Sequence, residues 1–254
     1  MTKYFILLTL VITTQFLLGC EGEDDLGPND FVIKFDIGLD SIVGDGTTTI
    51  PIKAFMDEDA DIAFRKIIFK TTDGSFIGAS SDKPNEIQVT AQVFNQEVFA
   101  DVSWKVPSRP GMVTITAEPV IEDLGGLFLI KDSIRVDTSA VATILLSASA
   151  FSVDNNFNKE ITIVGTLKNS NGKGVSSGTM VVFTDTFASN GNMVNGRFRS
   201  ENLATDISSN VSVIYSPGPV ASGQDIYLTG SVLNKDGDTT TISNTIKIYI
   251  TESD

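Results

Sequence analysis

The chain contains a single cysteine, Cys20, and the residues before it suggest why it is there. Cys20 follows an apolar run of fifteen residues, Tyr4 to Leu18, and a single basic residue, Lys3, precedes that run. A short apolar core behind a basic residue is the layout of a secretory signal, and the run falls short of the roughly 20 residues that span a bilayer. We therefore expect a signal peptide rather than a membrane span.

The end of this run, Leu17-Leu18-Gly19-Cys20, resembles the lipobox of bacterial lipoproteins. The resemblance implies that residues 1–19 are removed, that the Cys20 thiol takes a diacylglycerol, and that the new amino group is acylated, for instance with palmitate. Burial of acyl chains contributes about 0.8 kcal/mol per methylene. We therefore expect an outer-membrane lipoprotein on the cell surface or the periplasmic face. The alternative is a signal cut elsewhere, with Cys20 left as a free thiol.

The sequence lacks the residues on which most enzyme chemistry depends. It contains no histidine, which excludes Ser-His-Asp and Cys-His nucleophile systems and the usual zinc sites. Gly172-Lys173-Gly174 lies between two expected strands and is typical of a turn rather than of a phosphate loop. A glycosidase needs only two carboxylates, but the 32 acidic residues give no reason to select a pair. We predict no catalytic residues and no enzyme activity.

Charge further limits the partners. Residues 20–254 carry 17 basic and 32 acidic side chains, a net charge of −15. This argues against binding nucleic acid and against lying flat on anionic lipid, so membrane contact is expected through the anchor alone. Glu21 to Asp30 is acidic and poor in apolar residues, which predicts a disordered tether of at most about 35 Å. Its acids also resemble the export signals of some surface lipoproteins, and a plain linker is the alternative.

From Phe31 onward the sequence alternates between apolar and polar residues in short runs separated by turn residues. Alternating positions on one face are Ile50, Ile52, Ala54 and Met56, and later Val113, Ile115 and Ala117. Closely spaced runs of this period predict an antiparallel sandwich or barrel. Pro51 cannot donate to a strand ladder, so we expect its strand to lie at an edge or to carry a bulge.

Five segments of the chain occur twice at a nearly constant spacing. The matched pairs are Ile52 with Ile163, Phe69 with Phe183, Trp104 with Tyr215, Ile115 with Leu228, and Ile134 with Ile246. Such a repeat predicts two copies of one domain, which we place at residues 31–138 and 139–254. Each copy has about the length of an immunoglobulin-like sandwich.

The second copy resembles the bacterial Ig-like domains of invasin- and intimin-type surface proteins. The resemblance is carried by the strand Ile161–Leu167, the turn Asn169–Val175 and the strand Val181–Phe183, and the two copies together cover roughly residues 31–251. It implies an all-β fold of two tandem Ig-like antiparallel β-sandwiches behind the signal peptide. Residues 135–141 contain no Gly or Pro, so we expect the last strand of one copy to lead almost directly into the next and form a semi-rigid rod.

The same topology suggests a calcium site beside the junction of the two copies. The B–C loop (169–173) and the F–G loop (234–238) of copy two would lie there, and calcium prefers clustered carboxylate, amide and carbonyl oxygens. The candidate ligands are Asp137, Asn169, Asn171, Asp236 and Asp238. The alternative is that these are common turn residues whose side chains cap their own backbone. No other cofactor is expected.

The loops at the opposite end of copy two, residues 186–195 and 216–223, are the predicted contact surface for a partner. Phe187 and Met193 are the binding candidates, and a Phe that merely caps the core is the alternative. Trp104 and Tyr215 occupy equivalent positions, which favours a shared packing role. With one Trp and few Tyr, a glycan-binding platform is disfavoured.

These features predict a lipid-anchored cell-envelope protein that acts as a non-catalytic spacer, adhesion or interaction module. The sequence leaves open whether its surface partner is a protein or a glycan. The alternative function is a carbohydrate-binding accessory lipoprotein of an outer-membrane glycan uptake system.

Overall fold

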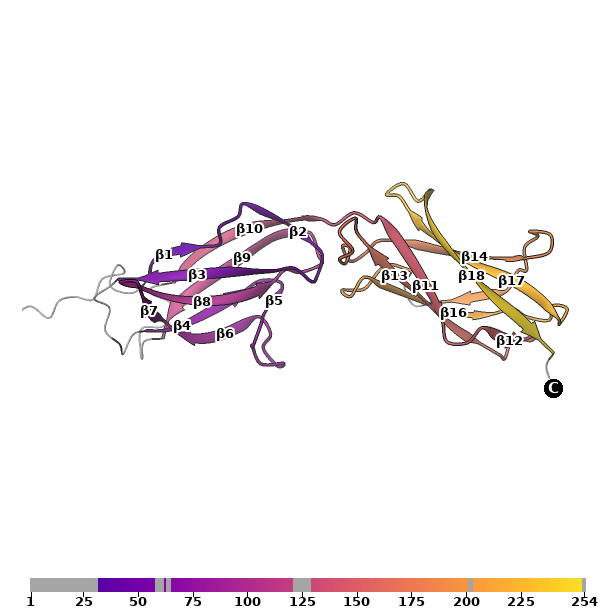
Figure 1. Ribbon diagram of the computed structural model, residues 1–254, viewed down its shortest axis with the longest axis horizontal. Coiled ribbons are helices and arrows are strands. Elements are labelled where there is room, and N and C mark those ends of the chain that lie inside the picture. The colour runs from indigo at the N-terminus through magenta and orange to yellow at the C-terminus, as the bar shows by residue number, and fades with distance from the viewer. Residues whose placement is uncertain (1–31, 58–61, 63–64, 121–128, 201–202, 253–254) are drawn as a thin grey trace, which may run out of the picture.

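The computed structural model describes residues 32–57, 62, 65–120, 129–200 and 203–252. The expected signal peptide (1–19), Cys20 and the expected tether (21–30) lie outside these residues. Regular structure in the described part of the chain consists of eighteen strands. That part has no helix of the length and apolarity needed to cross a membrane. Figure 1 shows two β-domains placed end to end, with the C-terminus at the end remote from the first domain.

The first domain is a sandwich of two five-stranded sheets. One sheet follows the order β1-β3-β8-β5, and β7 also pairs with β8. The other follows the order β2-β10-β9-β4-β6. The strands of the first sheet are β1 (Val32–Asp36), β3 (Thr49–Met56), β5 (Ser75–Phe76), β7 (Gln92–Phe94) and β8 (Glu97–Lys105). Those of the second are β2 (Ser41–Gly44), β4 (Lys66–Thr71), β6 (Glu86–Thr90), β9 (Gly111–Pro119) and β10 (Ile130–Thr138).

The second domain repeats this plan with two four-stranded sheets, in the orders β11-β13-β16-β15 and β12-β18-β17-β14. The strands of its first sheet are β11 (Thr143–Ala148), β13 (Ile161–Lys168), β15 (Arg197–Arg199) and β16 (Asn210–Ser216). Those of its second sheet are β12 (Ser152–Asp154), β14 (Val181–Phe187), β17 (Gln224–Leu233) and β18 (Thr239–Thr251). The predicted all-β fold of two tandem Ig-like sandwiches is confirmed.

Each domain has its own hydrophobic core, built by alternation along the strands. In β3 the buried side chains are those of every second residue, from Ile50 to Met56, as the sequence predicted. Trp104 and Tyr215 are fully buried in the two cores. Trp104 lies opposite Ile50, and Tyr215 lies opposite the equivalent Ile161. The shared packing role of the two aromatic residues is therefore confirmed.

One pairing in each domain is parallel, which the sequence did not predict. The short strand β2 pairs with β10, and β12 pairs with β18 in the same place of the second domain. In each domain the chain leaves its first strand and crosses to the opposite sheet before it turns back. The short strands have only four and three residues, too few to show a period.

The repeat also needs one correction, at its last strand. Val113 pairs with Ile134 in the first domain, and the equivalent Ile226 pairs with Ile248 in the second. Ile134 therefore corresponds to Ile248 and not to Ile246. Burial agrees, because Ile134 and Ile248 are fully buried. A shift of two residues keeps the same face of a strand inward, and for this reason the alternating pattern alone gave the wrong match.

The position expected for Pro51 is also corrected. Its strand, β3, lies between β1 and β8 and is not an edge strand. The pairing with β1 ends at Lys53, however, while the pairing with β8 continues past Pro51. Proline is tolerated in this internal strand because the ladder with β1 does not extend beyond Lys53, which leaves Pro51 without a partner on that side.

Candidate functional site at the domain junction

Four residues, 139–142, join the domains between the end of β10 at Thr138 and the start of β11 at Thr143. Ser139 is buried in this linker. Its N–H donates to Ser176 Oγ at 2.8 Å, and its hydroxyl donates to the carbonyl of Gly174 at 2.9 Å. The linker is thereby tied to the loop between β13 and β14, residues 169–180, which contains the predicted B–C loop and is called the B–C loop from here on. The expected direct passage from one domain to the next is confirmed.

Further hydrogen bonds run from the second domain to the first. The N–H of Ser177 donates to the carbonyl of Ser108 at 3.1 Å. Ser176 Oγ lies 3.4 Å from the carbonyl oxygen of Gly44, to which it donates. These contacts connect the B–C loop with two loops of the first domain, one before β3 and one after β8. Apart from the Ser176 hydroxyl, the groups that make these contacts belong to the backbone, so little side-chain freedom is lost when the domains meet.

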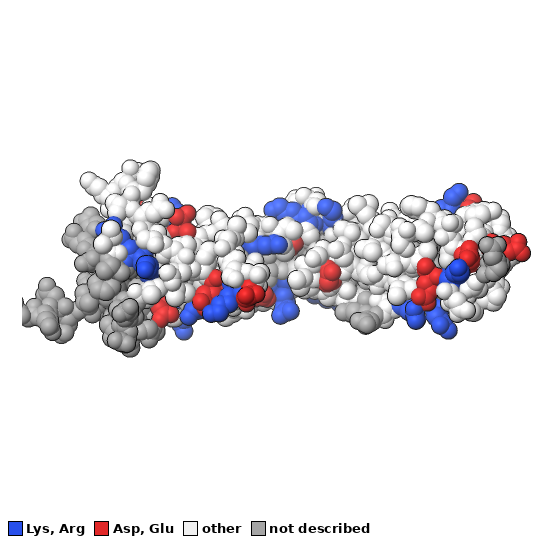
Figure 2. All heavy atoms as spheres, turned by 90° about the horizontal axis from the view of Figure 1, so that it is seen from below, with Lys and Arg blue, Asp and Glu red and all other residues white. Residues whose placement is uncertain are grey.

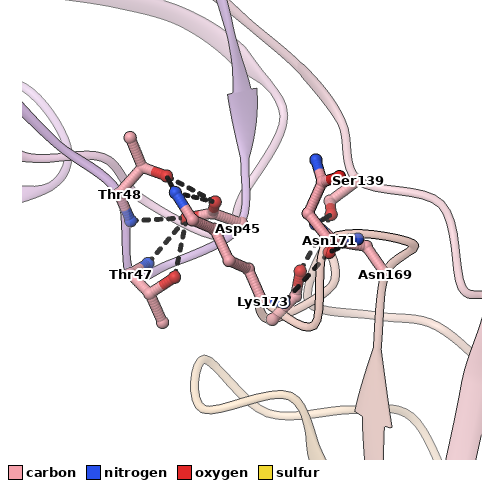
Figure 3. A network of polar contacts seen from close by, with 8 residues as sticks. Asp45, Thr47, Thr48, Ser139, Asn169, Asn171 and Lys173 are labelled. Atoms are coloured by element: carbon pink, nitrogen blue, oxygen red, sulfur yellow. Dashed lines mark hydrogen bonds and ion pairs between the residues drawn. The ribbon is translucent and has the colours of Figure 1, made fainter.

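Asp45 is the centre of the polar contacts in Figure 3. Its Oδ1 accepts hydrogen bonds from the N–H groups of Thr47 and Thr48 at 2.8 and 2.6 Å. Lys173 reaches across from the second domain and donates to Thr48 Oγ1 at 2.6 Å, with its Nζ 3.8 Å from Asp45 Oδ2. Burial raises the pKa of Asp45, but the hydrogen bonds from Thr48 and Thr47 outweigh it, so the pKa lies below its usual value. The carboxylate is therefore charged at neutral pH.

Gly174 brings the two backbones into direct contact. A Cβ built on Gly174 would overlap the carbonyl oxygen of Asp45 and would lie 2.6 Å from Ser209 Oγ. No other residue type fits this position without displacing one domain from the other. The Gly172-Lys173-Gly174 turn, which the sequence marked only as a turn, is therefore part of the domain contact.

A cleft of about 310 Å³ opens beside these contacts. The first domain supplies most of its walls, and Ile207 of the second domain forms one edge. The lining residues from the first domain with charged side chains are Asp73, Lys105 and Arg109. Figure 2 shows Lys and Arg side chains gathered near the middle of the molecule, where the domains meet. The full sequence, by contrast, has a net charge of −14.

The two loops that were predicted to supply calcium ligands form the same type of turn. Asn169 Oδ1 accepts from the N–H groups two and four residues further on, both at 3.0 Å. Asn234 Oδ1 accepts from the equivalent N–H groups, both at 2.9 Å. In each turn a glycine with positive φ, Gly172 or Gly237, follows the middle residue. The capping interpretation therefore accounts for both of these amide oxygens.

The other calcium candidates are exposed or paired. Asp137 forms an ion pair with Arg135 at 2.8 Å, and Asn171, Asp236 and Asp238 are exposed. Among the described residues, no three acidic, histidine or cysteine side chains gather as a metal site would require. Calorimetric titration with calcium tests the metal-site interpretation against the turn-capping interpretation.

Strand β14 ends at Phe187 and runs toward the end of the second domain remote from the first (Figure 1), and Met193 lies beside the end of this strand through its bridge with Thr186. Phe187 is partly buried and packs against the second core. Met193 is 51% exposed. The loop between them is closed by a hydrogen bond from the N–H of Phe187 to the carbonyl of Asn192 at 2.8 Å. Phe187 thus has the core-capping position that was the alternative, and contact of either residue with a partner stays a prediction.

Three exposed aromatic residues at this far end were missed by the sequence analysis. Phe151, Phe157 and Tyr249 have 67%, 43% and 46% of their surface exposed. The Tyr249 N–H donates to the carbonyl of Phe151 at 3.0 Å, which joins two of them. Arg197 lies 5.5 Å above the centre of the Phe157 ring. The sequence did contain a clue, because Phe157 stands within a polar Asn-rich loop and not on an alternating strand position.

No protein-family model matches the chain, and no curated protein matches it either. Several solved structures do match the chain. The D0–D1 domain of intimin is 16% identical over 86% of this chain and 98% of its own, with a TM-score of 0.30. The Yersinia pseudotuberculosis adhesin InvE is 12% identical over 89% of this chain and 61% of its own, with a TM-score of 0.42.

Domains 5–6 of the S-layer protein SbsC are 14% identical over 87% of this chain and 97% of their own, with a TM-score of 0.29. Intimin is one of the protein types whose Ig-like domains the sequence resembles. Identities and TM-scores of this size carry no information on function. The fold assignment rests on the sheets, registers and cores described above.

Proposed function

We propose that this protein is a lipid-anchored component of the cell envelope that holds an interaction surface away from the membrane. The observation that carries the proposal is the junction, where contacts through Gly174, the Ser176 hydroxyl and the Ser177 N–H hold two Ig-like domains in line. A flexible pair of domains would sample many distances from its anchor. A fixed pair keeps its far end at one distance from the start of the first domain, so that only the tether varies the distance to the anchor.

The expected reach follows from the chain dimensions. The tether spans at most about 35 Å when extended. Each domain adds about 30–35 Å, from strands of up to ten residues or so at ~3.3 Å per residue. The far end of the second domain would then stand up to about 100 Å from an anchor at Cys20. This end carries the exposed Phe151, Phe157 and Tyr249, and exposed aromatic residues are enriched where proteins meet their partners.

Two experiments test the proposal. In the first, cells are labelled with radioactive palmitate, and lipid is expected on the natural chain but not on Cys20→Ser. Palmitate on the Cys20→Ser variant would refute lipidation at this residue. Protease added to intact cells then shows whether the protein faces outward or inward.

In the second experiment, the mature polypeptide without lipid (residues 21–254) is tested for binding to cells and to envelope polysaccharides. We expect the double variant Phe151→Ser, Tyr249→Ser to lose binding. The control is Val93→Ser, Phe94→Ser in the first domain, where the side chains are 58% and 64% exposed. Equal binding by both double variants would show that the far end is not the contact surface. Binding to a polysaccharide alone would favour a glycan-uptake accessory protein.

A further inference from the structure

We propose that the cleft at the domain junction binds a small ligand carrying an oxyanion, a carboxylate or phosphate group, through Lys105 and Arg109. The proposal does not depend on lipidation or on the far end of the second domain. It rests on the charges in the cleft, on its shape, and on a comparison with the equivalent place in the second domain.

The two cations of the cleft have no partner within the described residues. Most described Lys and Arg side chains form an ion pair, a ring contact or a hydrogen bond. Those without one are Lys66, Lys105, Arg109, Lys131 and Lys235. The acidic residue in the lining, Asp73, accepts a hydrogen bond at Oδ1 from the N–H of Gly74 at 2.7 Å and forms no ion pair with either cation. Two unpaired cations beside one carboxylate favour the binding of an anion. Hydrogen bonds between charged groups are also stronger than those between neutral groups.

The shape of the cleft is held by rigid parts of the first domain. Its volume of about 310 Å³ is at the lower end of the roughly 300–1,000 Å³ of small-molecule sites. Gly74 has φ +79°, and a Cβ there would lie 2.6 Å from both the Lys105 carbonyl oxygen and Trp104 Nε1. Trp104 is fully buried and donates from Nε1 to the carbonyl of Asp73 at 3.2 Å. The buried indole therefore fixes the loop that forms one wall.

The second domain shows that the fold does not require such a cleft. Phe157 stands at the position equivalent to Gly46, which lines the cleft, and Gly218 at the position of Pro107. A Cβ on Gly218 would lie 2.5 Å from the Phe157 ring, so the ring covers this place. Ser216 replaces Lys105 there. In the second domain, the Phe157 ring thus fills this space. In the first domain, the same space is open and is lined by two cations.

The cleft also belongs to both domains. Ile207 of the second domain lines it with a side chain that is 73% exposed, and a Cβ on Gly46 would lie 3.1 Å from the Ile207 carbonyl oxygen. A ligand in the cleft would touch both domains. Because a ligand stabilises the state that binds it, occupancy should strengthen the junction.

The test uses the mature polypeptide, residues 21–254, titrated by NMR or calorimetry. The probes are glucuronate, glucose 6-phosphate, inorganic phosphate and, as the uncharged control, glucose. We expect the anions to bind at millimolar concentration or better and glucose not to bind. Binding should weaken as salt is added, because the contact is electrostatic and close to the surface. Comparison of the sugar anions with inorganic phosphate shows whether the oxyanion alone suffices or the sugar ring contributes.

Lys105→Gln, Arg109→Gln should weaken anion binding by about tenfold or more. The matched control is Lys66→Gln, Lys131→Gln, which removes the same charge from other unpaired sites of the first domain and should leave binding unchanged. Failure of all anions to bind, or an equal loss in the control variant, would overturn the proposal. Circular dichroism confirms that each variant is folded.

Discussion

Replacing Gly174 by alanine should separate the two domains without unfolding either. The added Cβ would overlap the backbone carbonyl of Asp45 across the junction, where no flexible side chain can give way. The B–C loop must therefore move back by about an ångström to restore ordinary van der Waals contact. The hydrogen bonds from Ser176 and Ser177 to the first domain would lengthen or break as it does.

The cost can be worked from these contacts. A neutral hydrogen bond contributes about 1 kcal/mol net, and two such bonds cross the junction, to Gly44 and Ser108. The side chain of Lys173 is 48% exposed, so its ion pair adds little. Losing about 2 kcal/mol lowers the ratio of locked to free domains by roughly 30-fold. The alanine also presses on Ser209 Oγ, so a small loss of stability in the second domain is expected as well.

The assay is a distance measurement between spin labels. The mature polypeptide without Cys20 has no cysteine, so labels can be placed at Lys131→Cys and Ser243→Cys, both exposed. We expect a narrow distance distribution in the parent and a broad one in Gly174→Ala. Gly172→Ala is the control. Its φ of +73° makes alanine cost about 1–2 kcal/mol, but nothing lies within 4 Å of the added Cβ. A narrow distribution in Gly174→Ala would refute the account of the junction.

Three further predictions concern single groups. Burial raises the pKa of Asp45, but hydrogen bonds from Thr48 and Thr47 within the first domain lower it below its usual value, so its contribution to the stability of that domain is present at neutral pH and lost as the pH falls below about 4; Asp45→Asn should therefore lower the unfolding free energy in urea at pH 7 by more than at pH 3, and an equal difference at both pH values would contradict this. Burial and the Asp185 carboxylate raise the pKa of Tyr215, whose hydroxyl donates to Asp185 at 2.9 Å; Tyr215→Phe should therefore lower the unfolding free energy in urea by about 1–3 kcal/mol, and an unchanged value would contradict this. Calorimetric titration with millimolar calcium should give neither heat nor a higher melting temperature, whereas measurable heat would restore a calcium site.

Much of the fold could be predicted because burial imposes a period of two on each strand. Alternation placed Ile50 and Ile115 in the core, and the repeat matched Trp104 with Tyr215. A period of two does not fix the register of a strand, however. A two-residue shift leaves the inward face unchanged, so Ile246 and Ile248 could not be told apart before the pairing with β17 was known.

The candidate site was less predictable because it is made of loops from both domains. Asp45 and Lys173 are 128 residues apart in sequence and meet only because the domains dock. Each lies in a turn that contains glycine, and polar residues are common in such turns, so their types do not indicate a contact between domains. The cations Lys105 and Arg109 likewise have no local pattern. Their importance depends on the absence of neighbouring acids, which only the folded arrangement shows.

The two domains differ at one equivalent position, which is Gly46 in the first domain and Phe157 in the second. Because Gly46 has no side chain, the backbone of Ile207 can approach the end of the first domain closely. The second domain docks at this end. Phe157 fills the equivalent position at the end of the second domain and rests on Gly218. An Ig-like domain could not dock on that end with the geometry of the junction, because the ring occupies the space that Gly46 leaves free. The far end is therefore suited to a different type of contact, one in which the Phe157 ring is itself part of the surface offered.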